Sequence, residues 1–145
     1  MPEFAPRFDS VNLVVGDMDA SLAFYRRLGV DIPDRGPWDD DHRTAETPEG
    51  LDFELDRQSF ARQWNSGYPG SRGRGAAVFG FKVATRAEVD AIHADLTGAG
   101  YSSQLEPHDA FWGSRYAIVE DPDGNAVGIM SPMDDAYRSA PPHGG

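Results

Sequence analysis

Apolar residues in the first half of the chain follow the period of a strand and then the period of a helix. Val11, Leu13 and Val15 recur at every second position, which predicts a β-strand. Residues 19–29 then place apolar side chains on one helical face, and Gly29 is a suitable C-terminal stop. A short extended piece and two further strands complete the expected order, at residues 30–33, 42–46 and 51–56.

The second half of the chain repeats this order. Residues 78–83 predict a strand, and Thr85 followed by Glu88 has the spacing of a capping box at the start of a helix that ends at Gly100. A further extended piece and two strands are expected at residues 101–106, 115–120 and 125–130. The chain therefore contains the unit βαβββ twice, which is an internal repeat and indicates an α+β fold.

The 145 residues are expected to form a single domain with a linker and a tail. Its expected parts are module one at about 8–56, a linker at about 57–75, module two at about 76–131 and a tail at 132–145. The stretch "RQSFARQW" at the start of the linker predicts a helical turn, whereas the later part is a loop rich in glycine and serine. The tail ends in "APPHGG" and is expected to be loosely held.

Composition and charge narrow the function classes. Hydrophobic residues make up 39% of the chain, enough for a sizeable core, and no apolar run approaches the length of a membrane span. The formal net charge of −11 disfavours binding to nucleic acid or to anionic membranes. The chain has no cysteine, which excludes disulfides and thiolate sites. Without a signal-peptide pattern at the N-terminus, a cytoplasmic location is the simplest expectation.

Two turns of similar sequence precede the last predicted strand of each half. Residues 121–124 ("DPDG") and 47–50 ("TPEG") both place proline second and glycine fourth, as β-turns favour. When the two stretches are superposed, Glu54 falls opposite Gly128. One half therefore carries a carboxylate at a position where the other half has no side chain.

Two sequence segments resemble the vicinal oxygen chelate superfamily, which includes glyoxalases, extradiol dioxygenases and bleomycin-resistance proteins. They are "GDMDASLAFYRRLG" after the first strand and "WGSRYAIVEDPDGNAVGIM" near the end, and the resemblance covers about residues 8–131. It implies two modules that form a curved eight-stranded sheet around a cleft. Metal-dependent members hold a divalent ion with side chains from the first and last strands of the modules, usually His or Gln with Glu.

The positions that correspond to these metal ligands do not supply a ligand set. The resemblance places them at Ser10, Glu54, Val78 and Gly128, and of these only Glu54 is a good donor. Shifting the register by one residue adds only Asp9 as a plausible donor. We therefore expect neither a metal nor another cofactor, and the nearest likeness is to the metal-free drug-binding branch.

The four histidines do not provide an evident catalytic set. His93 lies on the predicted second helix, His143 in the tail, and His42 at the start of a strand that is expected to be at the surface. His108 lies beside Asp109 and is a candidate base, although a loop histidine is the simpler interpretation. The chain also lacks a nucleophile elbow and a phosphate-binding glycine loop.

Aromatic residues outside the periodic strand and helix positions predict a surface that stacks on a ligand. Gly80, Ala126 and Gly128 are expected to leave room on the floor of the cleft. The predicted ligand-binding residues are Asn12, Trp38, Glu54, Trp64, Tyr68, His108, Phe111, Trp112, Tyr116 and Met130.

A small floor, a ring-lined rim and acidic side chains favour a metal-free protein that sequesters an aromatic natural product or antibiotic, as in self-resistance. The alternative is a glyoxalase- or dioxygenase-like enzyme that acts on a small dicarbonyl or aromatic substrate, and a ligand-free structural or regulatory subunit is a third class. The absence of a recognised catalytic set favours binding over catalysis and leaves both open. We also expect a homodimer, because single-chain members of the family commonly pair and open sheet edges need cover.

Overall fold

The computed structural model describes all residues except 1–7, 36–37, 39, 67, 71–76 and 142–145. The chain divides into two compact units, residues 1–71 (unit 1) and residues 72–145 (unit 2). Within the described ranges, every helix is too short or too polar to cross a membrane. The fold is α+β, with one sheet in each unit.

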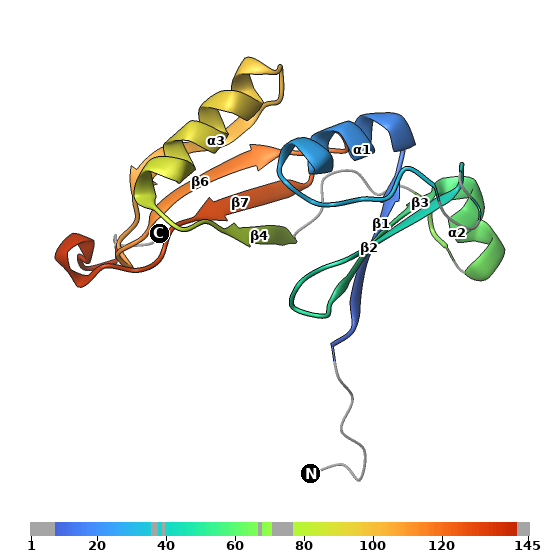
Figure 1. Cartoon of the computed structure of the whole chain (residues 1–145), viewed down its shortest axis with the longest axis horizontal. Coiled ribbons are helices and arrows are strands. Elements are labelled where there is room, and N and C mark those ends of the chain that lie inside the picture. The colour runs from blue at the N-terminus through green and yellow to red at the C-terminus, as the bar shows by residue number, and fades with distance from the viewer. Residues whose placement is uncertain (1–7, 36–37, 39, 67, 71–76, 142–145) are drawn as a thin grey trace, which may run out of the picture. The chain divides into compact units, whose positions relative to one another are not determined.

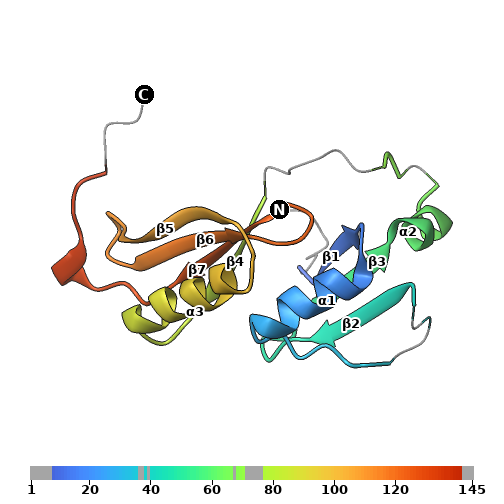
Figure 2. The ribbon, with the colours of Figure 1, turned by 90° about the horizontal axis from the view of Figure 1, so that it is seen from above.

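Unit 1 contains a three-stranded sheet and two helices. In chain order its elements are β1 (Ser10–Val15), α1 (Met18–Arg27), β2 (His42–Glu46), β3 (Asp52–Arg57) and α2 (Gln58–Trp64) (Figure 1). The strands lie in the order β1-β3-β2, with β1 parallel to β3 and β2 antiparallel to β3. Figure 2 shows β3 running directly into α2, which leaves α2 at the end of this sheet.

Helix α1 forms where the sequence predicts it, because both of its ends are defined. The Asp17 carboxylate accepts a hydrogen bond from the backbone N–H of Ala20 at 3.0 Å. Gly29 adopts a φ of 106° just beyond the helix. The buried face of α1 packs on the sheet through rings, since the Tyr25 and Phe53 centroids lie 4.9 Å apart. One face of the unit 1 sheet thus packs against α1 in the core, and the opposite face does not contact this helix.

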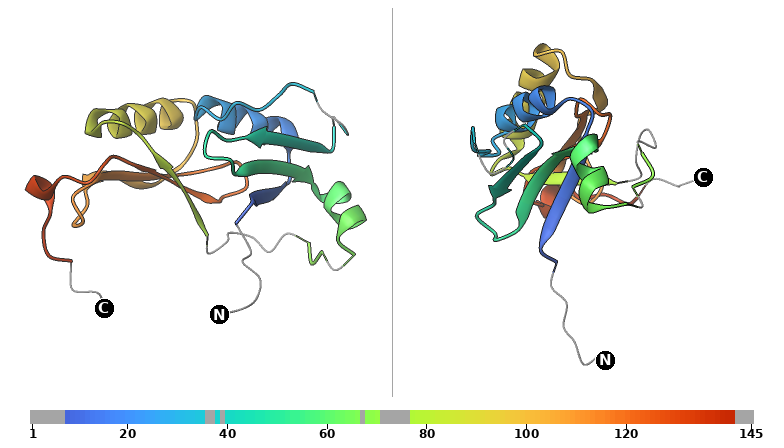
Figure 3. Two further views of the ribbon diagram at one scale, coloured as in Figure 1. Left: turned by 60° about the horizontal axis from the view of Figure 1, so that its bottom comes forward. Right: turned by 90° about the vertical axis from the view of Figure 1, so that its right-hand side faces the viewer.

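Unit 2 contains a four-stranded sheet covered by one long helix. Its elements are β4 (Val78–Lys82), α3 (Arg86–Gly98), β5 (Ser103–Asp109), β6 (Arg115–Glu120), β7 (Ala126–Met130) and the 3₁₀ helix η1 (Asp135–Tyr137). The order is β4-β7-β6-β5, with β4 parallel to β7 and the other pairs antiparallel. The predicted capping box is confirmed, with Thr85 and Glu88 each bonding the other's backbone N–H. Figure 3 shows α3 lying along one face of this sheet.

The strand count differs from the expected one. Residues 30–33 form no strand, so the described residues contain seven strands in two sheets of three and four. The curved eight-stranded sheet is therefore not shown. In unit 1 this segment is fastened by a side chain, because the Arg26 guanidinium donates to the Ile32 carbonyl at 2.9 Å. The corresponding segment of unit 2 does form a strand, β5, which ends three residues later than predicted. It is an edge strand and contains Pro107.

Two smaller expectations also change. The predicted helical turn after β3 is the seven-residue helix α2. The first part of the tail makes defined contacts, since the backbone N–H of Ser139 donates to the Phe111 carbonyl at 2.9 Å. The Arg86 guanidinium lies 3.6 Å from the centroid of the Tyr137 ring, which is a cation–π geometry. Composition alone missed these contacts because each joins the tail to a distant turn or helix.

We predict that Gly113→Ala destabilises unit 2 more than a change of backbone conformation alone would. Gly113 has a φ of 101°, and a Cβ there would lie 2.6 Å from the backbone oxygen of Asp134. The strained φ costs about 1–3 kcal/mol, and the clash with the tail adds to it. The matched control is Gly50→Ala, because Gly50 has a φ of 84° and open space around its Cβ position. Equal losses in the free energy of unfolding, measured by urea denaturation, would show that the tail does not pack against Gly113.

Candidate functional site

The face of the unit 1 sheet opposite α1 is polar. In the strand register, Glu54 pairs with Asn12 on one side and with Thr44 on the other. His42 pairs with Asp56 in the same antiparallel ladder. Side chains alternate between the two faces of a strand, so these five residues share one face while Phe53 and Leu55 point to the core.

Asp56 carries a buried carboxylate at the end of this face. The residue is 1% exposed. One carboxylate oxygen, Oδ2, accepts from Asn12 Nδ2 at 2.9 Å and from Trp64 Nε1 at 3.0 Å. The other, Oδ1, bonds to His42 Nδ1. Three donors from β1, β2 and α2 thus replace the water that this carboxylate loses on folding.

The second ring nitrogen of His42 faces away from Asp56. Its Nε2 lies 2.7 Å from the hydroxyl oxygen of Thr44 and 4.0 Å from a carboxylate oxygen of Glu54. The side chain of His42 is 15% exposed, so it is mostly enclosed but still reachable. A carboxylate can only accept, which assigns the proton to Nδ1 and leaves the lone pair of neutral His42 on Nε2.

Two aromatic rings lie close to His42. Its ring centroid lies 5.7 Å from that of Phe60 on α2 and 6.0 Å from that of Trp38. Trp38 is 64% exposed, and it has a φ of 63° that a tryptophan rarely adopts. Its carbonyl accepts the backbone N–H of His42 at 3.0 Å, so this turn sets the start of β2 beside the Trp38 ring.

These side chains enclose a hollow of about 370 Å³ in unit 1. Carboxylates and amides form its floor, and α2 supplies rings at its edge. Trp64 is 54% exposed although its Nε1 is bonded to Asp56, so the ring face is open to a partner. The lining residues are Ser10, Asn12, His42, Glu54, Asp56, Phe60 and Trp64.

Unit 2 gathers a second set of rings on the open face of its sheet. Tyr116 on β6 is central, with ring centroids 5.2 Å from Trp112 and 6.3 Å from His108. Phe111 stands edge-on to Trp112 at 5.1 Å. Met130 pairs with Tyr116 in the β6–β7 ladder. The edge-to-face contacts show that these rings pack on one another.

Gly128 does not leave open space, contrary to the expectation. A Cβ at this position would lie 2.8 Å from the hydroxyl oxygen of Tyr116, so the tyrosine ring occupies the volume that the glycine frees. Gly80, its partner in the β4–β7 ladder, has nothing within 4 Å of its Cβ position and matches the expectation. Ala126 is buried in the same strand as Gly128.

The ten predicted ligand-binding residues fall into two sets. Asn12, Trp38, Glu54 and Trp64 lie around the unit 1 hollow, while Tyr68 follows α2, with the Arg62 guanidinium 5.7 Å from its ring centroid. His108, Phe111, Trp112, Tyr116 and Met130 lie together in unit 2. That all ten bind one ligand stays a prediction.

Sequence reasoning missed His42 and Asp56. They are fourteen residues apart, and the interpretation of His42 as a surface residue is wrong because it is mostly enclosed. A usable signal was present. The turn at residues 47–50 joins two predicted strands, and the hairpin register that pairs Glu46 with Asp52 also pairs His42 with Asp56.

The described residues do not fit a family-type metal site. They contain no group of three or more His, Asp or Glu side chains that could hold an ion. Glu54 has Asn12 beside it on β1, but the equivalent pair in unit 2 is Gly80 and Gly128, which offer no donor. The Asp56 oxygens are directed at His42, Asn12 and Trp64 and do not converge with Glu54.

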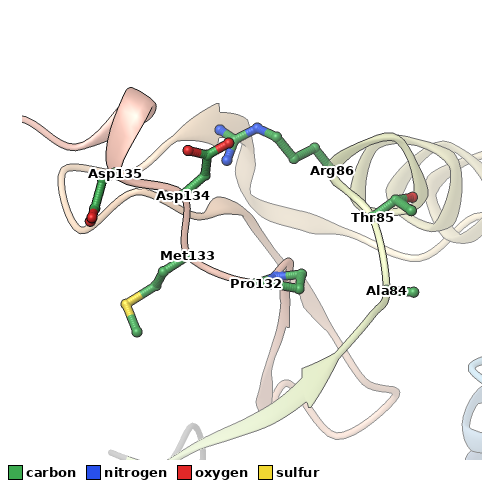
Figure 4. A pocket seen from close by; sticks show the side chains of 7 residues that line it. All are labelled: Ala84, Thr85, Arg86, Pro132, Met133, Asp134 and Asp135. Carbon is green, nitrogen blue, oxygen red and sulfur yellow. The ribbon is translucent and has the colours of Figure 1, made fainter.

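A larger hollow, of about 500 Å³, lies in unit 2 between the start of α3 and the tail. Figure 4 shows Arg86 reaching across it toward Asp134, while Met133 points away. Arg86 is already engaged, because it donates to the Gly113 carbonyl at 2.8 Å and to Asp109. The Arg86 guanidinium, assisted by Arg115, holds the pKa of the Asp109 carboxyl below its usual value. This cluster ties the tail to the unit, and neither a histidine nor an aromatic ring is among the residues that line the hollow.

One comparison with known proteins shows the family of the chain. A model described as "Glyoxalase/Bleomycin resistance protein/Dioxygenase superfamily" matches residues 7–129. A glyoxalase-related enzyme from Fulvimarina pelagi is similar in structure, with a TM-score of 0.76, 20% identity, and coverage of 88% of this chain and 89% of that one. None of the curated protein sequences matches the chain closely enough to count as a relative.

Two further solved structures have the same fold. A glyoxalase/bleomycin resistance protein/dioxygenase from Nocardioides has a TM-score of 0.70 and 21% identity, covering 99% of this chain and 93% of that one. A lactoylglutathione lyase from Agrobacterium tumefaciens has a TM-score of 0.63 and 22% identity, covering 90% of this chain and 94% of that one. At these identities the likeness shows the fold alone.

We predict that Gly128→Ala displaces the Tyr116 ring and lowers the free energy of unfolding by about 1–3 kcal/mol, as overpacking does. Gly80→Ala, in the adjacent strand, should be neutral or stabilising because its Cβ position is open. In a Tyr116→Leu background the cost of Gly128→Ala should largely disappear. Urea denaturation of the four proteins checks this double-mutant cycle, and additive losses would contradict the proposed contact.

Proposed function

We propose that this chain, which belongs to the glyoxalase/bleomycin resistance protein/dioxygenase superfamily, binds a small planar aromatic molecule and sequesters it. The observation that carries the proposal is the unit 1 hollow, where the exposed indole ring of Trp64 stands beside an acidic floor. A self-resistance role toward an aromatic antibiotic is the finer form of this proposal.

The charge of the hollow favours a neutral or cationic ligand. Glu54 and Asp56 line it directly, and Glu46 and Asp52 lie on the same face of the sheet. His42 is the only basic side chain among the lining residues, and it is already bonded to Asp56. An aromatic cation would gain attraction to the carboxylates and stacking on Trp64, whereas an aromatic anion would be repelled.

The enzymatic alternative includes a metal-dependent and a metal-independent reaction. A metal-dependent reaction on a dicarbonyl or catechol lacks its ligand set among the described residues. A metal-independent reaction needs only an oriented acid or base, and the contact between His42 and Asp56 favours it specifically. Sequestration remains the primary proposal because both functions require the same ligand to bind in the same hollow.

The charge preference can be measured with two three-ring probes of similar size. We expect the cation 9-aminoacridine to bind saturably and more tightly than the anion anthracene-9-carboxylate, measured by fluorescence polarisation of the probe. Trp64→Ala should weaken binding of the cation by about 0.5–1.5 kcal/mol, roughly 2- to 13-fold in Kd, because a stacking surface is lost. Trp64→Phe is the matched control, since it keeps a ring but removes the Nε1 bond to Asp56. Equal affinity for both probes, or no saturation, would rule the proposal out.

We also propose that the chain forms a homodimer in a cytoplasmic setting. Within the described residues, β1 and β2 are the edges of one sheet and β4 and β5 of the other, so each sheet has strands with one neighbour only. Unpaired edges are a liability that a partner copy can cover. Sedimentation equilibrium at micromolar concentration should give twice the mass of 15.8 kDa, and a monomer across that range would contradict this.

A further inference from the structure

The contact between His42 and Asp56 has the geometry of an oriented base. Asp56 is fixed from three sides, so it presents Oδ1 to the imidazole in one position. The backbone of His42 is fixed by the β2–β3 ladder and by the Trp38 carbonyl. Because Asp56 is fixed, it in turn fixes the tautomer and the orientation of the His42 ring. Side chains that transfer protons in enzymes are oriented in this way.

The lone pair of His42 becomes available to a ligand when one hydroxyl rotates away. His42 lines the hollow, and among the described residues Nε2 is bonded to Thr44 Oγ1 at 2.7 Å. A hydroxyl can rotate and turn its lone pairs toward a new imidazolium, so it does not block protonation. When Nε2 gains a proton, the positive ring lies between the carboxylates of Asp56 and Glu54. The charge that forms during the step is therefore compensated without movement of the strands.

A purely structural role explains less of this arrangement. A buried pair of charged groups contributes little to stability, because desolvation offsets most of the attraction. An exposed sheet face requires neither a buried carboxylate nor two aromatic side chains beside a histidine. Both features are explained if the hollow excludes water from a base and stacks a flat molecule against it.

We propose that His42 is a general base that removes a proton from the aromatic molecule bound in the unit 1 hollow, with Asp56 as its positioning residue. This inference rests on the proposed function, since the ligand must enter the same hollow. The substrate class is a planar aromatic compound, neutral or cationic, with an acidic C–H beside a carbonyl or iminium group.

The step balances without a co-reactant. The C–H bond breaks, its electron pair stays on the ligand, and an N–H bond forms at Nε2. Return of that proton to a second atom of the same ligand gives a tautomer and restores neutral His42. A cationic ligand becomes neutral when it loses the proton, which suits a site already lined by two carboxylates.

Thr44 makes nucleophilic catalysis the competing interpretation, because Asp56, His42 and Thr44 follow the order of an acid, a base and a hydroxyl nucleophile. Acyl transfer also needs donors where the oxyanion develops. Here Glu54 places a carboxylate oxygen 4.0 Å from Nε2, and Glu54 and Thr44 are direct partners in the ladder. A negative charge beside the hydroxyl opposes an oxyanion and favours a cationic imidazolium, so the geometry points to proton transfer.

The test uses the 1,2-dimethylquinolinium cation, a flat probe with acidic methyl C–H bonds beside an iminium group. Removal of one of these protons gives a neutral molecule, and ¹H NMR in D₂O reports the rate as the methyl protons exchange for deuterium. We expect saturable turnover by the whole chain, with kcat about 10²–10⁴-fold lower in His42→Gln. His93→Gln is the matched control, because His93 bonds to a hydroxyl in the same way, Ser103 Oγ at 2.7 Å, and lies in unit 2.

Asp56→Asn tests the positioning role. Its amide can donate to Nδ1, which favours the tautomer with the proton on Nε2 and removes the base. We expect kcat to fall while KM for the probe stays within a few-fold. The ¹⁵N NMR shifts of His42 should exchange between its two ring nitrogens, which a merely structural loss would not produce. Far-ultraviolet circular dichroism confirms that each variant is folded.

The outcomes separate the two proposals. Saturable binding of 9-aminoacridine with no turnover above free imidazole, or with turnover unchanged in His42→Gln, overturns the general base and leaves sequestration intact. Loss of turnover in Glu54→Gln with retention in His42→Gln assigns the base to Glu54 and also overturns the inference. Absence of binding by both probes overturns the proposed function itself.

Discussion

The carboxylate of Asp56 is buried, and the arrangement of the unit 1 face depends on satisfying it. Its three partners come from three different elements, with Asn12 on β1, His42 on β2 and Trp64 on α2. An ionised carboxylate without donors would cost far more than any one of these contacts contributes, so the three partners together offset its burial. One charge thereby joins both edge strands to the central strand and holds the short helix α2 over the end of the sheet. The same contacts that stabilise the face also aim the imidazole and the indole at the hollow.

The parallel strand pairs of the two units have equivalent registers but carry different side chains at equivalent positions. Asn12 and Glu54 are neighbours across the parallel pair of unit 1, and Gly80 and Gly128 are neighbours across the parallel pair of unit 2. In unit 2 the absent side chain at Gly128 admits the ring of Tyr116, which then packs against Trp112. At this register position unit 1 thus carries an amide and a carboxylate, whereas unit 2 carries two glycines and an aromatic ring in the freed space. A repeat of the backbone pattern does not imply a repeat of the site.

Much of the fold could be predicted because its signals are local. The capping box at Thr85, the glycine after α1 and the two proline–glycine turns each fix an element by contacts within a few residues. The strand at residues 30–33 was wrong because a period-two pattern cannot show whether a sheet edge will accept another strand, and here Arg26 satisfies the Ile32 carbonyl instead. The rings near His42 were partly predicted from their positions outside the periodic elements. His42 was not predicted as a base, because its partner Asp56 is distant in the sequence and is brought beside it by the register of the hairpin.

The position of Glu54 connects the family scaffold to the chemistry proposed for this chain. In a metal site a carboxylate at such a strand position needs partners that converge on an ion, and the neighbours of Glu54 are an amide and a hydroxyl, Asn12 and Thr44. Those neighbours cannot replace a cation, so the carboxylate has a charge that is best compensated by a ligand or by the imidazolium of His42, 4.0 Å away. Either event brings positive charge into the hollow, through an aromatic cation on binding or through a proton during reaction. Sequestration and proton transfer are therefore two uses of one electrostatic arrangement, and what separates them is whether the bound molecule carries a hydrogen that His42 can remove.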